Sequence, residues 1–335
     1  MNSGTVSAMR HPFRWLLSLR KKEPELSEIR KAAERLDVGR LIGTGGPELT
    51  FDWTEILPEK SEPRLFGFYS ASGVEYALRE LGVFGKIEKL GFSDLKVVFQ
   101  GDGWSQDMRI IGQASGREHL VMEGRFRRSS WRPDDDSPLW TALEETSFNV
   151  AMIEWFLLQN PLASFSPARP RLPGQKHPGL GLKDEIMSVF TVAARRLDLD
   201  AYLANAKLFH NAFMYSPMFF FLDGRLQAEM AAIKEAARDR PLQDISLAVE
   251  GGFLRRADLG ETYQWTGRTM IRPLSKALLI AYHKSGYREE VERIAAGMRF
   301  VFDWEGFQAA KPDLVDKIIE LQEDKALPSR EPLLF

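Results

Sequence analysis

One short segment of this chain holds the residues that could bind a phosphate. Gly179 and Gly181, separated by one residue, come directly before a helix that the sequence predicts to begin near Lys183. Glycine lets backbone N–H groups approach a ligand closely, and the first N–H groups of a helix have no partner within the helix. Because the same end of a helix is positive, the segment predicts an anion site suited to a phosphate.

The segment does not match two stronger nucleotide-binding patterns. A GxxxxGK[ST] loop needs a Lys-Ser or Lys-Thr pair at the helix start, which is missing here. The dinucleotide pattern GxGxxG fails because Asp184 stands where the third glycine belongs. The two glycines could therefore also form a tight turn packed against Pro173 and Pro178.

Other side chains near this segment could transfer protons. Glu154 lies in an apolar stretch, where burial would raise its pKa and allow it to accept a proton from an amine, although it could equally lie on the wet edge of a helix. Tyr215 could donate a proton or be an ordinary core tyrosine. His177 and His210 could act as bases or serve as hydrogen-bonded structural groups.

Predicted elements on both sides of the loop would hold these side chains. After it, apolar residues at helical spacing predict a helix over 183–197, followed by strand candidates 201–206 and 218–222. Tyr215 would lie on a short helix between these two strands. Before the loop, 141–158 could be entirely helical or could end in a buried strand, because its apolar residues fit both periods.

The first part of the chain predicts helices and then a strand meander. The spacing predicts a helix over 25–36, a short strand over 65–69, and a second helix that starts with a capping box at Ser72–Glu75. Strand-like segments separated by glycine-containing turns then predict an antiparallel meander. These segments are 95–99, 108–111 and 119–127.

The last third alternates helices with strands. Helices are expected over 226–238, 273–283, 287–296 and 312–323, and strands over 262–270 and 298–304. The sequence thus predicts a mixed α/β (α+β) fold with a central, mostly antiparallel sheet flanked by helices. We expect three parts: an N-terminal helical segment and connector (1–62), a core (63–224) and a C-terminal α/β extension (225–335).

Over residues 65–224 the order of elements resembles the acyl-CoA-binding half of the GNAT acyltransferase superfamily. The shared order is an apolar strand, a glycine-x-glycine loop, a long helix, a short strand, a short helix with a tyrosine, and a strand. The family's pyrophosphate loop has the pattern Q/R-x-x-G-x-G/A, which Lys176-His-Pro-Gly179-Leu-Gly181 approximates. Lysine replaces Gln or Arg, and Gln175 comes one residue early.

The resemblance implies a GNAT-like core that moves an acyl group from acyl-CoA to an amine or hydroxyl. It implies Tyr215 as the general acid that protonates the departing thiolate, with Glu154 or His210 as the base. It also implies a pyrophosphate site, made of Lys176, Gly179, Leu180, Gly181 and Leu182. No metal is expected. A non-catalytic structural or interaction protein that keeps the fold without binding CoA is the alternative, favoured by the acidic residues Asp184 and Glu185 at the helix start.

The composition of the chain excludes several classes of ligand. The 45 basic and 47 acidic residues give a net charge of −2, which offers no electrostatic footprint for nucleic acid. The chain has no cysteine, and its five histidines lack metal-ligand spacing, so no metal site is expected beyond a possible cation at the Asp134–Asp136 run. The basic segment from Arg10 to Lys22 could dock on the core or contact an anionic membrane surface. No apolar run is long enough to span a membrane, and we expect a cytoplasmic protein.

Overall fold

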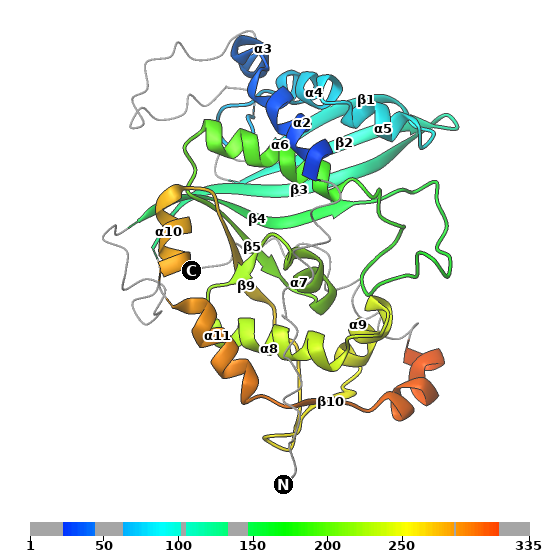
Figure 1. The fold of residues 1–335 in the computed structure, drawn as a ribbon. Helices are drawn as coiled ribbons and strands as arrows, with labels where there is room; N and C mark the ends of the chain where they lie inside the picture. Colours follow the sequence, from blue (N-terminus) through cyan, green and yellow to red (C-terminus); the bar gives the residue numbers. More distant parts are fainter. Residues whose placement is uncertain (1–22, 44–62, 102–104, 133–146, 285, 315–335) are drawn as a thin grey trace.

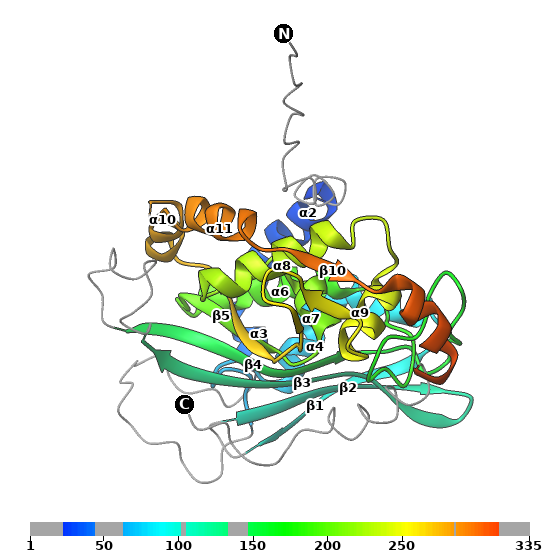
Figure 2. The same ribbon diagram turned by 90° about the horizontal axis from the view of Figure 1, so that it is seen from below.

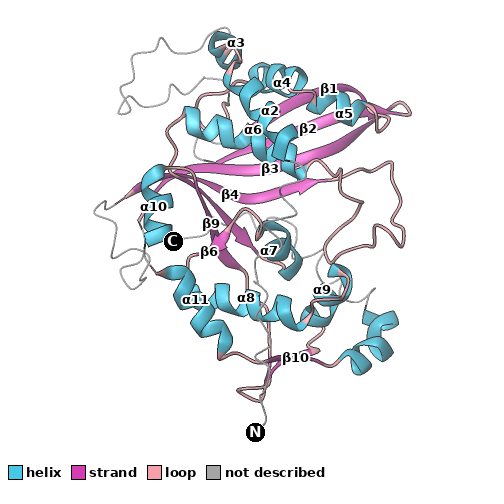
Figure 3. Cartoon of the chain, viewed as in Figure 1, coloured by secondary structure: helices cyan, strands magenta, loops and turns pink. Residues whose placement is uncertain are grey.

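A computed structural model describes residues 23–43, 63–101, 105–132, 147–284 and 286–314. A seven-stranded, mostly antiparallel sheet runs through the molecule and is flanked by helices (Figures 1 and 3). The expected mixed α/β fold is confirmed. The segment from Arg10 to Lys22, the Asp134–Asp136 run and most of the helix expected over 312–323 lie outside the described residues.

The helices before the sheet differ in detail from the predicted ones. The capping residue of the second predicted helix is Ser70, whose Oγ accepts from Gly73 N at 3.0 Å, and not Ser72. Glu75 does not take part in a capping box; its carboxylate instead accepts a hydrogen bond from Val97 N of the sheet at 2.7 Å. Gly82, at φ 70°, divides the predicted helix because it takes a left-handed conformation. Within the described residues these helices are α2 (Glu23–Glu34), α3 (Val38–Ile42), α4 (Ala71–Glu80) and α5 (Val83–Glu88).

The predicted strand over 65–69 is instead a tight turn closed by one bridge between Leu65 and Tyr69. The predicted meander is present and gains a fourth strand, so the ambiguous 141–158 segment ends as a strand. One face of the meander is buried under the helices, with Met108, Ile110 and Met122 fully enclosed. The other face carries cross-strand ion pairs. The strands are β1 (Ser93–Gly101), β2 (Ser105–Ala114), β3 (Arg117–Trp131) and β4 (Phe148–Leu158).

A bulge in β4 lies at Glu154. Arg125 of β3 pairs with Trp155, whereas the next residue, Phe126, pairs with Ile153, so Glu154 is an extra residue without a partner in the ladder. The parallel neighbour β5 (Ala201–Ala206) pairs with β4 only up to Ile153. The two parallel strands therefore part at the bulge, and the backbone of β4 beyond it is not paired with β5.

Helix α6 (Lys183–Arg196) connects these two parallel strands. Its packing is fixed by Tyr202 of β5, whose hydroxyl donates to Phe190 O at 2.7 Å, and by the Phe190 ring, 5.1 Å from the Phe126 ring. α6 also lies along α2, where Arg196 donates to Ala33 O at 3.0 Å. The loop before its N-terminal end is attached just beyond the carboxyl end of β4, where Asn160 N donates to Pro178 O.

The strand order is β1-β2-β3-β4-β5-β9-β6, which corrects the expected division at residue 224. β9 (Arg268–Pro273) lies between β5 and β6 (Phe220–Phe221), so the C-terminal part of the chain supplies an inner strand of the central sheet. The expected strands 218–222 and 262–270 are each shorter or shifted. Residues 225–314 are therefore integral to the core and do not form an extension beside it.

Helices after β5 contribute to two buried clusters, and Phe209 of α7 and Ile245 of α9 lie in the main one together with α6. A second cluster of buried residues joins β4, β5 and β9 to α8, α10 and α11, and includes Val150, Leu203, Ile271 and Leu278. The helix α9 has no counterpart among the predicted elements. These helices are α7 (Phe209–Tyr215), α8 (Gly224–Ala236), α9 (Leu242–Glu250), α10 (Lys276–Lys284) and α11 (Tyr287–Ala296).

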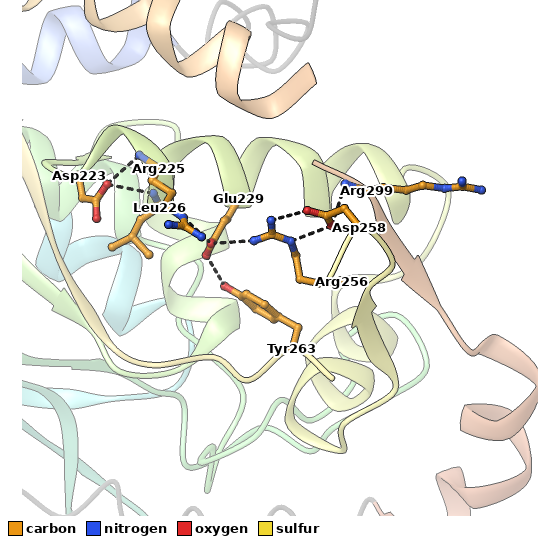
Figure 4. Close-up of polar contacts among 8 residues, drawn as sticks. All are labelled: Asp223, Arg225, Leu226, Glu229, Arg256, Asp258, Tyr263 and Arg299. Atoms are coloured by element: carbon orange, nitrogen blue, oxygen red, sulfur yellow. Dashed lines mark hydrogen bonds and ion pairs between the residues drawn. The ribbon is translucent and has the colours of Figure 1, made fainter. Parts of the chain in front are cut away.

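A buried ionic network attaches a small second sheet to α8 (Figure 4). Glu229 of α8 accepts from Arg256 Nη1 at 3.3 Å and from the Tyr263 hydroxyl at 3.2 Å. The Arg256 guanidinium also donates to both oxygens of Asp258, at 3.0 and 2.6 Å. Figure 2 shows β10 of this sheet running across α8. The sheet consists of β7 (Leu254–Arg256), β8 (Glu261–Thr262) and β10 (Phe300–Phe302).

Candidate functional site

The glycine loop presents its backbone to solvent. Gly179 and Gly181 are both exposed, and Gly181 has φ +76°, a conformation that favours glycine. A Cβ at Gly179 would have only Leu158 O near it, at 3.7 Å, and one at Gly181 would have no neighbour within 4 Å. Leu180 and Leu182 alternate with the glycines and are buried, so their side chains anchor the loop.

The rest of the loop is tied to the sheet and to α9. Asn160 N, just beyond β4, donates to Pro178 O at 2.7 Å, and Gln243 of α9 donates to Arg171 O at 2.9 Å. Lys176 is exposed and His177 is half-buried. The loop is thus attached both to the end of β4 and to α9. The side chain of Lys176, three residues before Gly179, is exposed to solvent.

The acidic start of α6 is largely neutralised. Glu185 is buried and forms an ion pair with Lys86 of α5 at 3.0 Å. Asp184 lies 3.8 Å from Lys183 Nζ. Since each carboxylate has a cation beside it, the repulsion of an incoming phosphate is weaker than the sequence alone suggests. The first N–H groups of α6 have no side-chain cap, because the N-cap residue is Leu182.

Lys183 connects the start of α6 with the end of α7. Its Nζ donates to Met214 O at 3.0 Å, which brings the residue before Tyr215 to the helix start that follows the glycine loop. Burial raises the pKa of Tyr215 to about 12, so the hydroxyl stays protonated at neutral pH. Its ring packs 5.8 Å from Phe219, and the described residues give its hydroxyl no hydrogen-bond partner. Two predicted site features, the loop and Tyr215, are therefore brought to one end of α6.

Glu154 lies at the β4 bulge on the polar face of the meander. Its carboxylate is 3.3 Å from Arg127 Nε, and about a quarter of the side chain is exposed (23%). Two similar pairs lie beside it on the same face, Arg125–Asp107 at 2.6 Å and Arg109–Glu123 at 2.7 Å. Glu154 is four residues, about 13 Å, from the end of β4 near the loop. To act as a base, the Glu154 carboxylate would first have to break its ion pair with Arg127.

His210 is not at this site. It is buried between α7 and α9, where its Nδ1 lies 3.3 Å from the Ser246 hydroxyl, and burial lowers its pKa to about 4. His210 and Tyr215 are five positions apart on one helix, about 140° around its axis, and so point to different sides. The expected role of His210 as a base is replaced by a structural one.

A basic residue that was not among the predicted site residues lies beside the end of α7, at the residue after Tyr215. Lys234 of α8 hydrogen-bonds the hydroxyl of Ser216 and lies 4.7 Å from the centre of the Phe213 ring. Burial lowers its pKa to about 8. A signal was present: Lys234 continues the apolar stripe of its helix, four residues after Met230 and one after Ile233, where a charged residue is unusual.

No protein-family model matches this sequence. Within the described ranges, no group of three or more metal-ligating side chains lies together. No helix in the same ranges combines the length and apolar character needed to cross a bilayer.

Proposed function

We propose that this protein binds acyl-CoA and transfers its acyl group to an amine or hydroxyl acceptor. The observation that carries the proposal is the parting of two parallel strands at the Glu154 bulge, with an exposed glycine loop and an uncapped helix start at that end. A gap of this kind offers unpaired backbone donors and acceptors to an extended ligand, and the helix start suits its pyrophosphate. The order of elements that carries the GNAT resemblance supports the same reading.

In this proposal, the backbone N–H groups of Gly179 to Leu182 and the α6 start bind the pyrophosphate, with Lys176 beside them. The acceptor attacks the thioester carbonyl and the C–S bond breaks. Tyr215 gives its proton to the sulfur that leaves, and Glu154 takes the proton that the acceptor loses. Lys234, next to the end of α7, would add positive charge near that sulfur. The proposal includes a cytoplasmic location, which the lack of cysteine fits.

A non-catalytic role is the second candidate, and one observation favours it. Glu154 is paired with Arg127, and His210 is enclosed with Ser246, so both predicted bases already have a partner within the protein. A protein of this kind would keep the fold and would bind no CoA. It would act through its surface on another molecule. The first experiment must therefore measure binding before turnover.

Thermal unfolding with and without CoA distinguishes the acyltransferase from the non-catalytic role. A ligand at 100 times its Kd should add about 2.7 kcal/mol to the free energy of unfolding. Gly179→Ala should abolish this gain because its methyl group would occupy the open space where the phosphate lies, while the chain around it is not crowded. Gly85→Ala on α5, where the new methyl group meets nothing within 4 Å, is the control and should keep the gain.

Three outcomes decide the matter. A CoA-dependent gain that is lost only in Gly179→Ala supports the acyltransferase. A gain that survives Gly179→Ala moves the CoA site away from the loop. The absence of any gain in the wild-type protein leaves the non-catalytic role.

A further inference from the structure

A cavity of about 320 Å³ lies beside the first turns of α6, the helix that follows the glycine loop. It is bounded by α2, α6, the 217–220 segment, the end of β9 and α10, and no residue of Gly179–Leu182 lines it. Most of its wall is apolar, with Met187 and Met218 among the lining residues. Its volume is at the small end of the range for ligand pockets.

The polar group that stands out in this wall is Arg272 of β9. It pairs across the sheet with Tyr202, whose hydroxyl bonds to α6, so Arg272 faces the α6 side where the cavity lies. Within the described part of the chain, its hydrogen-bonding is limited to a 3.7 Å contact from Nη1 to the sulfur of Met218. A guanidinium carries five donors, so this one leaves most of them to the cavity.

The charges around Arg272 are of its own sign. Burial is the main cause that lowers the pKa of Arg272, to about 10; Tyr202 acts to raise this pKa, and the nearby cations Arg30 and Arg195 lower it further. Arg30 also lines the cavity. Among the described lining residues the carboxylate is that of Asp184, which lies 3.8 Å from Lys183 and is not among the charges that act on Arg272. Arg272 is half-buried. A cation that is partly withdrawn from water and has no counter-ion beside it is costly, and a bound anion would lower that cost.

We propose that this cavity binds a small organic carboxylate with an apolar chain. The carboxylate pairs with the Arg272 guanidinium, whose planar fork matches two carboxylate oxygens, and the chain lies against Met187 and Met218. The apolar walls favour such a ligand over a bare inorganic anion, which would leave them unfilled. The inference does not depend on acyl-CoA binding at the glycine loop.

Hexanoate is the test ligand, with hexanol as a chain without charge and acetate as a charge without a chain. In the wild-type protein, hexanoate should shift the NMR methyl signals of Met187 and Met218, and both comparison compounds should bind at least tenfold more weakly. The site is wrong if hexanoate leaves both methionine signals in place. Equal binding of hexanol or of acetate overturns the paired charge or the apolar chain, respectively.

Arg272→Met tests the charge directly. It should weaken hexanoate binding by about 10–100-fold, since a charge-assisted bidentate contact is lost. Arg225→Met, at an exposed arginine of α8, should leave binding unchanged. Without ligand, Arg272→Met should keep or raise the Tm, because it removes a half-buried charge that has no counter-ion beside it. A variant that melts earlier or does not fold would mean that Arg272 already has its partner within the protein, and the proposal would fail.

Discussion

At the scale of single residues, Tyr215 and Tyr202 differ in the hydrogen bonding of their hydroxyl groups. The Tyr202 hydroxyl is buried and donates to Phe190 O, whereas the Tyr215 hydroxyl has no partner among the described residues. A hydroxyl without a protein partner contributes little to folding and is available to a ligand. This contrast makes Tyr202 a matched control for the role proposed for Tyr215.

Tyr215→Phe should lower turnover by about 10²–10⁴-fold and leave the free energy of unfolding nearly unchanged, because one proton donor is lost and the ring remains. Tyr202→Phe should cost about 1–3 kcal/mol of stability, since Phe190 O loses its buried donor. Release of CoA from acetyl-CoA can be followed with a thiol-reactive dye, and the chain gives no background because it has no cysteine. An unchanged rate in Tyr215→Phe would remove Tyr215 from the mechanism.

His210 should make the protein sensitive to mild acid. Its pKa is about 4 in the folded protein against an ordinary 6.5, so the unfolded chain binds more protons between these values. The free energy of unfolding therefore falls as the pH falls through this window, by about 2 kcal/mol between pH 7.5 and pH 5. Urea unfolding at several pH values measures it, and His210→Gln should flatten the curve. The same slope in the variant would assign the effect to other groups.

At the scale of elements, the α8 network offers two arginines on one carboxylate. Arg256 is 9% exposed and lies 3.3 Å from Glu229, whereas Arg225 is 64% exposed and lies 3.8 Å from it. Arg256→Met should cost about 3–5 kcal/mol, because Glu229 and Asp258 lose a buried partner. Arg225→Met should cost less than about 1 kcal/mol, since an exposed pair contributes little. Equal losses in denaturant unfolding would show that burial does not set the strength of this network.

The elements also show what the sequence could predict. The order from the meander through the loop, α6, β5 and α7 follows from apolar spacing, which is a local property. The bulge at Glu154 could not be predicted, because it depends on the register with β3. The same limit applies to the site: the glycines reveal a loop, but only the fold places His210 away from it and Lys234 near Tyr215.

At the scale of the whole molecule, the sheet joins parts of the chain that are far apart. β9 pairs over its full length, Arg268–Pro273, with β5, and it also holds β6. A chain that ends at Gly224 lacks this inner strand and leaves residues such as Leu203 and Phe221 without their neighbours. It should not unfold cooperatively, and it should aggregate on size-exclusion chromatography. A cooperative melt of this fragment would instead support a separate domain over 63–224.

The pairing of β5 with β9 also has a consequence for folding during synthesis, because β9 comes much later in the chain. β5 emerges from the ribosome before the 207–267 segment does, so its free edge waits about 3–12 s for β9 at 5–20 residues per second. An open edge of apolar residues such as Leu203 is a template for pairing with other chains. The nascent protein is therefore most exposed to misassembly during that interval, and chaperones that shield it then should raise the yield of folded protein.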